Sequence, residues 1–251
     1  MSLFGHELRG QLRLYWRSRE LAFFTFALPI IMFFLLGSVY GNDRIKAEGN
    51  VRGADYLLAG MLGYGAIATG FAGLSIMLVI RREAGVLKRL RATPLPAATY
   101  IAALLTTTIL AYALEAVVMI ALGRVSFHTH TRHAFSLALA LLLGIAAFTA
   151  LGLALTTLIR AAEGASAVVN AAYLPASFIS GAFFSSHSFP AFLRAIADVL
   201  PLVYVIRLVR DVMLRGAEIW QRPGAVAVVA AWGAAGAVLA ARRFRWEPRE
   251  G

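Results

Sequence analysis

The sequence contains no cysteine and only two lysines, and both features restrict its chemistry. Without Cys, disulfides, thiolate metal sites and Cys nucleophiles are excluded. A phosphate-binding P-loop needs Gly-Lys-Ser/Thr, because backbone N–H groups and the Lys must surround the phosphates. Neither Lys46 nor Lys88 follows a Gly. The chain therefore has no Walker A site, and any ATP that drives it must be hydrolysed on another polypeptide.

Charged residues are also scarce, at 15% of the chain against 60% hydrophobic residues, which is far from the composition of soluble domains. The 24 Lys and Arg outnumber the 13 Asp and Glu, but they lie at the ends of apolar runs and form no single basic stripe. This distribution argues against a nucleic-acid partner. The sequence also lacks a Gly-x-Ser-x-Gly elbow, and the apolar runs contain no Asp. We therefore do not expect the chain to be an enzyme by itself.

Long apolar runs dominate what remains. A hydrocarbon core of about 30 Å needs about 20 apolar residues in a helix. Six runs meet this length, and a water-exposed bundle could not hide helices that are apolar on every face. The sequence predicts an all-α membrane protein of one domain, residues 1–251, with six transmembrane helices at about 21–41, 57–80, 101–122, 134–159, 165–185 and 224–241.

The first twenty residues form a different pattern. Phe4, Leu8, Leu12 and Trp16 are spaced four apart, and Arg9, Arg13 and Arg17 repeat this spacing one position later. Such spacing predicts an amphipathic helix over 1–20 that lies along the membrane interface, in contact with lipid headgroups. A packed helix of a soluble cap is the alternative interpretation.

The distribution of cations predicts the orientation. Segments 1–20, 81–100, 160–164 and 242–251 hold 14 of the 24 Lys and Arg, and the intervening segments hold 10. The positive-inside rule places the richer set, and with it both termini, in the cytoplasm of a multi-pass protein in the cell membrane.

Residues 186–222 are too many for a tight loop and too apolar for a free one. Pro190 and Pro201 bracket "AFLRAIADVL", and "LVYVIRLVRDVMLRG" follows with Arg207, Arg210 and Asp211 at helical spacing. We expect two short helices that enter or rest on the outer leaflet, with arginines that reach toward the headgroups.

Residues 81–96, "RREAGVLKRLRATPLP", gather five cations between the second and third predicted spans. The pattern predicts a short helix that ends before Pro94. Val86, Leu87 and Leu90 can pack inward or into the groove of a partner, and we expect the cations Arg82, Lys88, Arg89 and Arg91 to stay in water or meet acidic groups. From composition alone, a positive-inside anchor explains the segment equally well.

This stretch resembles the loop after the second span of ABC-2 type ABC transporter permeases, in which an acidic residue, a Gly, a Leu-x-x-Leu pair and a Thr-Pro-Leu recur in this order. "LPLVYVIRLVRDVM" before the last span and "SGAFF" at 180–184 are similar to two further segments of that family. The resemblance covers essentially the whole chain and is greatest to the short drug-export permeases of the daunorubicin-resistance and nodulation type.

The resemblance implies a permease that acts as two copies with two copies of a stand-alone ABC ATPase, which binds ATP and Mg²⁺. The loop at 81–96 would be the coupling loop that docks the ATPase, through Arg82, Glu83, Gly85, Leu87, Leu90, Thr93 and Pro94. The re-entrant segment would be 189–214, with Pro201, Tyr204 and Arg210. The expected cargo is an amphipathic drug or another lipid-like small molecule, and a polysaccharide or glycolipid is the second candidate.

Polar residues within the predicted spans suggest a translocation path. Glu115 is the only acidic residue well inside a predicted span, where a carboxylate must face protein or water. Thr108, Tyr112 and Glu115 share one helical stripe, and Asn170 and Tyr173 begin another that continues to Ser177 and Phe184. Hydrogen-bonded packing between helices is the alternative, and a proton- or ion-coupled carrier that uses Glu115 is an alternative function.

The loop "HTHTRH" brings together His128, His130 and His133. A metal site is conceivable, but no carboxylate lies close in sequence, and a short polar turn explains the segment as well. We expect no metal.

Overall fold

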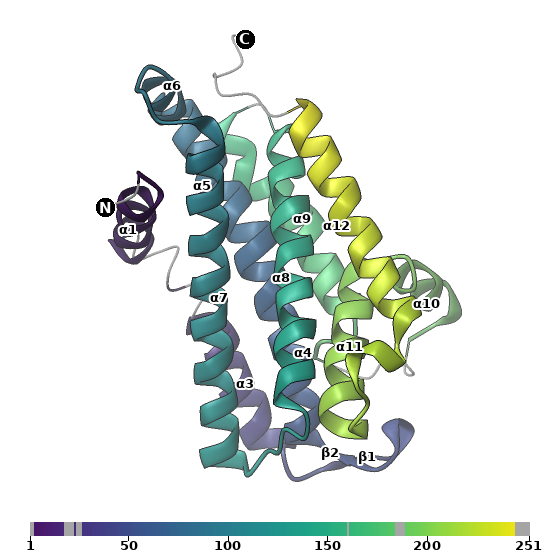
Figure 1. The fold of residues 1–251 in the computed structure, drawn as a ribbon. Coiled ribbons are helices and arrows are strands. Elements are labelled where there is room, and N and C mark those ends of the chain that lie inside the picture. The colour runs from purple at the N-terminus through teal and green to yellow at the C-terminus, as the bar shows by residue number, and fades with distance from the viewer. Residues whose placement is uncertain (1–2, 18–22, 24–26, 160, 184–188, 244–251) are drawn as a thin grey trace.

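A computed structural model describes residues 3–17, 23, 27–159, 161–183 and 189–243. The described part is a bundle of helices (Figure 1), with one two-residue antiparallel hairpin, β1 (Arg44–Ile45) and β2 (Val51–Arg52). The short 3-10 helix η2 (Lys46–Glu48) joins the two strands. The predicted all-α fold is confirmed.

The centre of the bundle is α4 (Gly53–Ile67), in which nearly every residue is buried. It continues through a π-helical stretch, η3 (Ala68–Gly73), into α5 (Leu74–Glu83). Around this axis lie α3 (Leu28–Tyr40), α7 (Ala97–Phe127), α8 (Ala134–Thr156) and α11 (Pro201–Arg215). Because α4 is rich in Ala and Gly, the surrounding helices can approach it closely.

Four helical segments are long and apolar enough to cross a membrane: Gly53–Glu83, Ala98–Phe127, Ala134–Thr156 and α12 (Pro223–Arg243). They correspond to the second, third, fourth and sixth predicted spans. The first predicted span includes α3, a shorter apolar helix, and lies partly outside the described residues. The fifth corresponds to α9 (Ala162–Ile179), whose Glu163, Asn170 and Pro175 make it less apolar. The count of six spans therefore stays a prediction.

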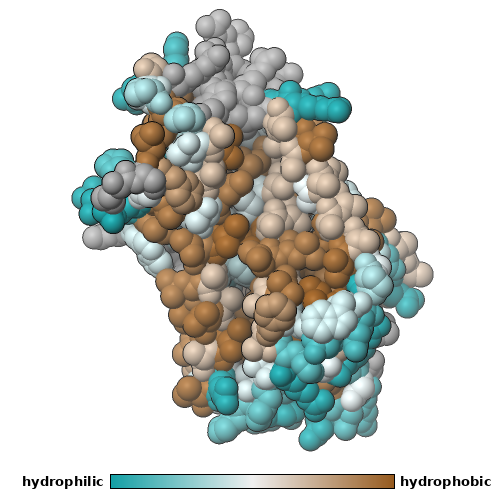
Figure 2. Space-filling model, viewed as in Figure 1, coloured by the Kyte–Doolittle hydropathy of each residue, from teal (hydrophilic) through white to brown (hydrophobic). Residues whose placement is uncertain are grey.

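The surface matches a membrane setting. Figure 2 shows a hydrophobic band across the middle of the molecule, with hydrophilic surface toward both ends. Large apolar side chains are exposed on the outer helices, among them Val117 on α7 and Val238 on α12. Such a continuous apolar surface is covered by lipid or by another protein chain.

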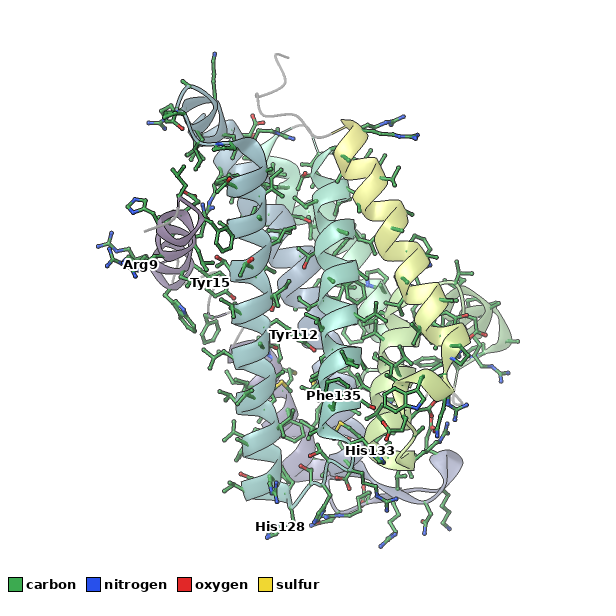
Figure 3. The ribbon with its side chains drawn as sticks, in the orientation of Figure 1. Arg9, Tyr15, Tyr112, His128, His133 and Phe135 are labelled. Atoms are coloured by element: carbon green, nitrogen blue, oxygen red, sulfur yellow. The ribbon has the colours of Figure 1, made fainter. Side chains whose placement is uncertain are left out.

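Helix α1 (Leu3–Arg17) confirms the predicted N-terminal helix and lies against α7. Its packed face carries Gln11 and Tyr15, which are buried, whereas Phe4 and Trp16 of the apolar stripe stay exposed. Arg9 points away from the bundle, and Tyr15 points toward it (Figure 3). The helix thus uses one face for the bundle and leaves apolar and basic side chains outside, as an interfacial position requires.

The segment before α12 forms two helices as expected, α10 (Ala191–Ala197) and α11, separated at Pro201. Helix α11 is buried along most of its length and packs against α4, α8 and α12. A 3-10 turn, η5 (Ile219–Gln221), then leads into α12. Whether α10 and α11 are re-entrant in a membrane stays a prediction.

Candidate functional site

The strongest candidate site is the loop between α5 and α7, which forms one end of the molecule (Figure 1). A short helix, α6 (Val86–Arg91), ends before Pro94 as predicted. It is separated from α5 by Gly85, whose φ of +70° is a left-handed conformation that favours glycine. The glycine turns the chain sharply, so that α6 folds back onto the end of the bundle.

Arg82 anchors the start of this loop. Its side chain donates hydrogen bonds to the carbonyl oxygens of Thr156 at 2.9 Å and Ile159 at 2.7 Å, at the C-terminal end of α8. These carbonyls belong to the last turn and its exit, where helices leave acceptors unsatisfied. Arg82 is only 4% exposed, so of the two expected environments it is not in water but meets an acidic group, with Glu83 Oε1 3.3 Å from its Nε. Its role in this structure is to tie α5 to the end of α8.

Leu87 holds α6 itself. It is fully buried in a second hydrophobic cluster with Leu74, Leu78, Tyr100 and Leu104, and Leu90 is half-buried against the same cluster. Leu87 thus packs inward, which was one of the two interpretations of the sequence. Its side chain offers no surface to a partner in this structure, and its effect on docking would be through the position of α6.

The outward surface of the loop is basic and polar. Lys88, Arg89, Thr93 and Pro94 are exposed, and Glu83 is partly exposed beside Arg82, with 3.3 Å between its Oε1 and Arg82 Nε. Of the seven residues expected to dock the ATPase, the structure therefore presents Thr93 and Pro94 fully and Glu83, Gly85 and Leu90 in part. Lys88 and Arg89 are exposed charges of the helix, and the side chain of Arg91 lies outside the described part.

A polar link connects the loop region to α1. Arg81 donates a hydrogen bond to Gln11 Oε1 on α1 at 2.5 Å and a longer one to the Tyr100 hydroxyl on α7 at 3.4 Å. Gln11 in turn donates to Glu7 at 2.7 Å. Sequence reasoning missed this link, because Gln11 lies outside the apolar and basic stripes of α1 and carries no signal of its own.

The polar stripe of α7 faces α4. Thr69 donates a hydrogen bond to Glu115 Oε2 at 3.0 Å, and the Tyr112 hydroxyl donates to the Leu62 carbonyl at 2.7 Å. Thr108 is buried as well and bonds the backbone of its own helix. Tyr112 points into the bundle in Figure 3. In this structure Tyr112 and Glu115 thus form a packed interface with α4 and η3, whereas Thr108 lines a small cavity of about 10 Å³ beside Gln11 and Tyr15 of α1.

One carboxylate oxygen of Glu115 lacks a hydrogen-bond donor in the described structure. Its Oε1 is buried without a hydrogen-bond partner in the described part of the chain. This oxygen packs against Gly65, where an added Cβ would lie 2.3 Å from it. A side chain at position 65 would therefore displace the Glu115 carboxylate from its present position.

The stripe of α9 is divided between two environments. Tyr173 is buried and stacks on Tyr64 of α4, with ring centroids 5.7 Å apart, whereas Asn170 is exposed on the outer face of α9. Ser177 is buried and bonds its own helix backbone, and Phe184 lies outside the described residues. Tyr173 therefore faces α4, and Asn170 does not.

The re-entrant candidates lie at the other end of the molecule. Pro201 is buried at the start of α11, and the Tyr204 hydroxyl donates to the Asp198 carbonyl at 2.8 Å. The guanidinium carbon of Arg210 lies 3.5 Å from the centre of the Tyr56 ring, and Arg210 also bonds the Gly181 carbonyl. Burial lowers the pKa of Arg210, while Tyr56 and Glu48 oppose that shift.

The histidine loop lies near this end too (Figure 3). His128 ends α7 in a left-handed conformation, and His133 Nδ1 lies 3.2 Å from Glu218 Oε1. Glu218 also accepts a hydrogen bond from Ser136. Among the described residues no group of three His, Cys, Asp or Glu could hold a metal ion. His133 and Ser136 thus connect the start of α8 to Glu218, which lies before α12. Sequence spacing could not reveal this contact.

Comparison with known proteins adds one finding. The family described as ABC-2 type transporter matches residues 3–214, which include the loop around α6 and helices α10 and α11. No curated protein shows significant similarity to the chain.

Proposed function

The chain belongs to the ABC-2 type transporter family and is thus the multi-pass membrane component of an ABC transporter, and from this premise we propose that it is the permease subunit of an exporter. It is not itself catalytic, and the family implies an ABC ATPase as partner. The proposed complex contains two permeases and two ATPase subunits, which bind ATP and Mg²⁺. Both termini and α6 lie on the cytoplasmic side.

The observation that carries this proposal is how α6 is attached. Its outer surface is exposed and basic, while Leu87 beneath it is fully buried and Arg82 before it bonds the end of α8. A force on the exposed surface would therefore reach α5, α7 and α8 together. Closure of the ATPase pair would in this way bias the packing of the spans, for which a few kcal/mol of differential stabilisation suffices.

The experiment compares two double variants of the full chain, purified from its native membranes with an affinity tag. Lys88→Glu with Arg89→Glu reverses two exposed charges of α6 and leaves Arg82 and Leu87 unchanged. Arg242→Glu with Arg243→Glu reverses an exposed pair in the last turn of α12 and serves as the matched control.

ATP hydrolysis and an ABC ATPase subunit, identified by mass spectrometry, are measured in each eluate. We expect the parent chain and the α12 variant to retain both, and the α6 variant to lose both. Retention by the α6 variant would show that docking does not use this surface.

We propose an amphipathic drug or lipid-like molecule as the cargo, with a polysaccharide or glycolipid as the second candidate. Tyr112 and Glu115 of α7 pack against α4 and η3 within one chain. A path formed between two copies, along the exposed apolar faces, suits a cargo that is itself largely apolar.

A proton-coupled carrier is the alternative, favoured by the unpartnered Oε1 of buried Glu115. Such a carrier would transport its cargo under a proton gradient in vesicles depleted of ATP. Glu115→Gln would abolish that transport and its pH dependence. An ATP requirement, with transport retained in Glu115→Gln, would exclude the carrier.

A further inference from the structure

A cavity of about 380 Å³ lies between α10, α11 and the 3-10 helix η2, toward the end of the bundle opposite α6. Its size falls within the range of about 300–1,000 Å³ that is typical of small-ligand sites. Five arginines line it: Arg194, Arg207, Arg210, Arg215 and Arg222. Figure 2 shows hydrophilic surface gathered over this region of the molecule.

Acidic residues neutralise only part of this charge. Asp211 binds both Arg215 at 2.6 Å and Arg222 at 2.8 Å, and Asp198 binds Arg207 at 2.5 Å. Glu48 is the third acidic residue of the lining. With five arginines against three carboxylates, the cavity carries a surplus of two positive charges.

Arg194 and Arg210 form no salt bridge with Asp198 or Asp211 in the described structure, and the charge of Glu48 acts on Arg210. Arg194 is exposed and has no carboxylate partner among the described residues. Arg210 is largely enclosed by the Tyr56 ring and the Gly181 carbonyl, and its Nε is buried with no hydrogen-bond partner in the described structure. A buried charged donor without a partner is costly, and Arg210 lines the cavity, so an acceptor bound there would stabilise this side chain.

We propose that this cavity binds a phosphate group, with Arg194 and Arg210 as its principal ligands. Guanidinium groups recognise phosphate through paired N–H donors, and two of them match the charge of a phosphate better than that of a neutral ligand. The group is carried by a lipid headgroup or by free phosphate, which share this chemistry. The proposal does not depend on the export function or on the identity of the cargo.

The test measures binding by titration calorimetry to the full chain in a neutral maltoside detergent and phosphate-free buffer. The probes are dihexanoylphosphatidylglycerol, inorganic phosphate, and dihexanoylglycerol, which lacks the phosphate. The variants are Arg194→Gln and Arg210→Gln. Arg124→Gln is the matched control, because Arg124 is an exposed arginine in the last turn of α7 that does not line the cavity.

We expect a phosphate-bearing probe to bind the parent chain and Arg124→Gln equally, about tenfold more weakly to Arg194→Gln, and at least as weakly to Arg210→Gln. Dihexanoylglycerol should not bind. Tighter binding of the phospholipid than of inorganic phosphate assigns the site to a headgroup, and comparable binding assigns it to free phosphate.

The proposal is overturned if neither phosphate probe binds the parent chain, or if both Arg194→Gln and Arg210→Gln bind like Arg124→Gln. Since Arg194 is exposed, its variant keeps the test decisive even if Arg210→Gln fails to fold.

Discussion

Arg82 offers the sharpest test of how α6 is joined to the bundle. Its guanidinium bridges the carbonyl oxygens of Thr156 and Ile159. A hydrogen bond from a charged donor contributes about 1.5–3 kcal/mol when its partner is buried. The lower value applies here, since water can enter at the end of the bundle, so two bonds give about 3 kcal/mol.

Replacing Arg82 with Gln should therefore lower the free energy of unfolding by about 3 kcal/mol. For a chain of this size, 1 kcal/mol corresponds to about 2–4 °C in Tm, which gives an expected decrease of about 6–12 °C. Arg82→Lys keeps the charge but cannot bridge two carbonyls with a planar fork. Its Tm should therefore lie between that of the parent chain and that of Arg82→Gln. The measurement is thermal unfolding of the purified chain in detergent.

Arg89→Gln is the matched control. Arg89 lies six residues beyond the end of α5, is exposed, and makes one hydrogen bond of 3.1 Å to the Ala84 carbonyl. The Tm of Arg89→Gln should change by less than about 2 °C, because water can replace an exposed hydrogen bond at little cost in free energy. If Arg82→Gln were as stable as Arg89→Gln, the hydrogen bonds from Arg82 to α8 would contribute nothing measurable to the free energy of unfolding.

Two further predictions concern the packing and the orientation of the bundle. Gly63→Ala should destabilise the chain by about 1–3 kcal/mol in the same unfolding assay, because the new Cβ would lie 2.4 Å from Ile206 of α11; Gly10→Ala, which meets nothing within 4 Å, should not. The chain has no cysteine, so Arg89→Cys and Arg124→Cys each create a single thiol. In intact cells a membrane-impermeant maleimide should label Arg124→Cys alone, and labelling of Arg89→Cys would place α6 outside.

The prediction of α6 from the sequence succeeded because its signals are local. Pro94 limits the end of the helix through local backbone geometry. The start of the helix after the left-handed Gly85 was not predicted. The long apolar runs are also local signals. In lipid, the backbone N–H and C=O groups of such a run must bond within the run itself, which favours a helix. What the sequence could not assign was which of two nearby cations, Arg82 or Arg89, would be buried.

The sequence by itself determined the class of protein, the position of most long apolar helices and the lack of a Gly-Lys-Ser/Thr motif. Periodicity and composition suffice for these features, because they follow from interactions between residues close in the chain. Only the tertiary structure decided that Glu115 meets Thr69, that Arg82 reaches the end of α8, and that five arginines surround one cavity. Each of these contacts joins segments far apart in sequence, and their geometry depends on how the helices pack.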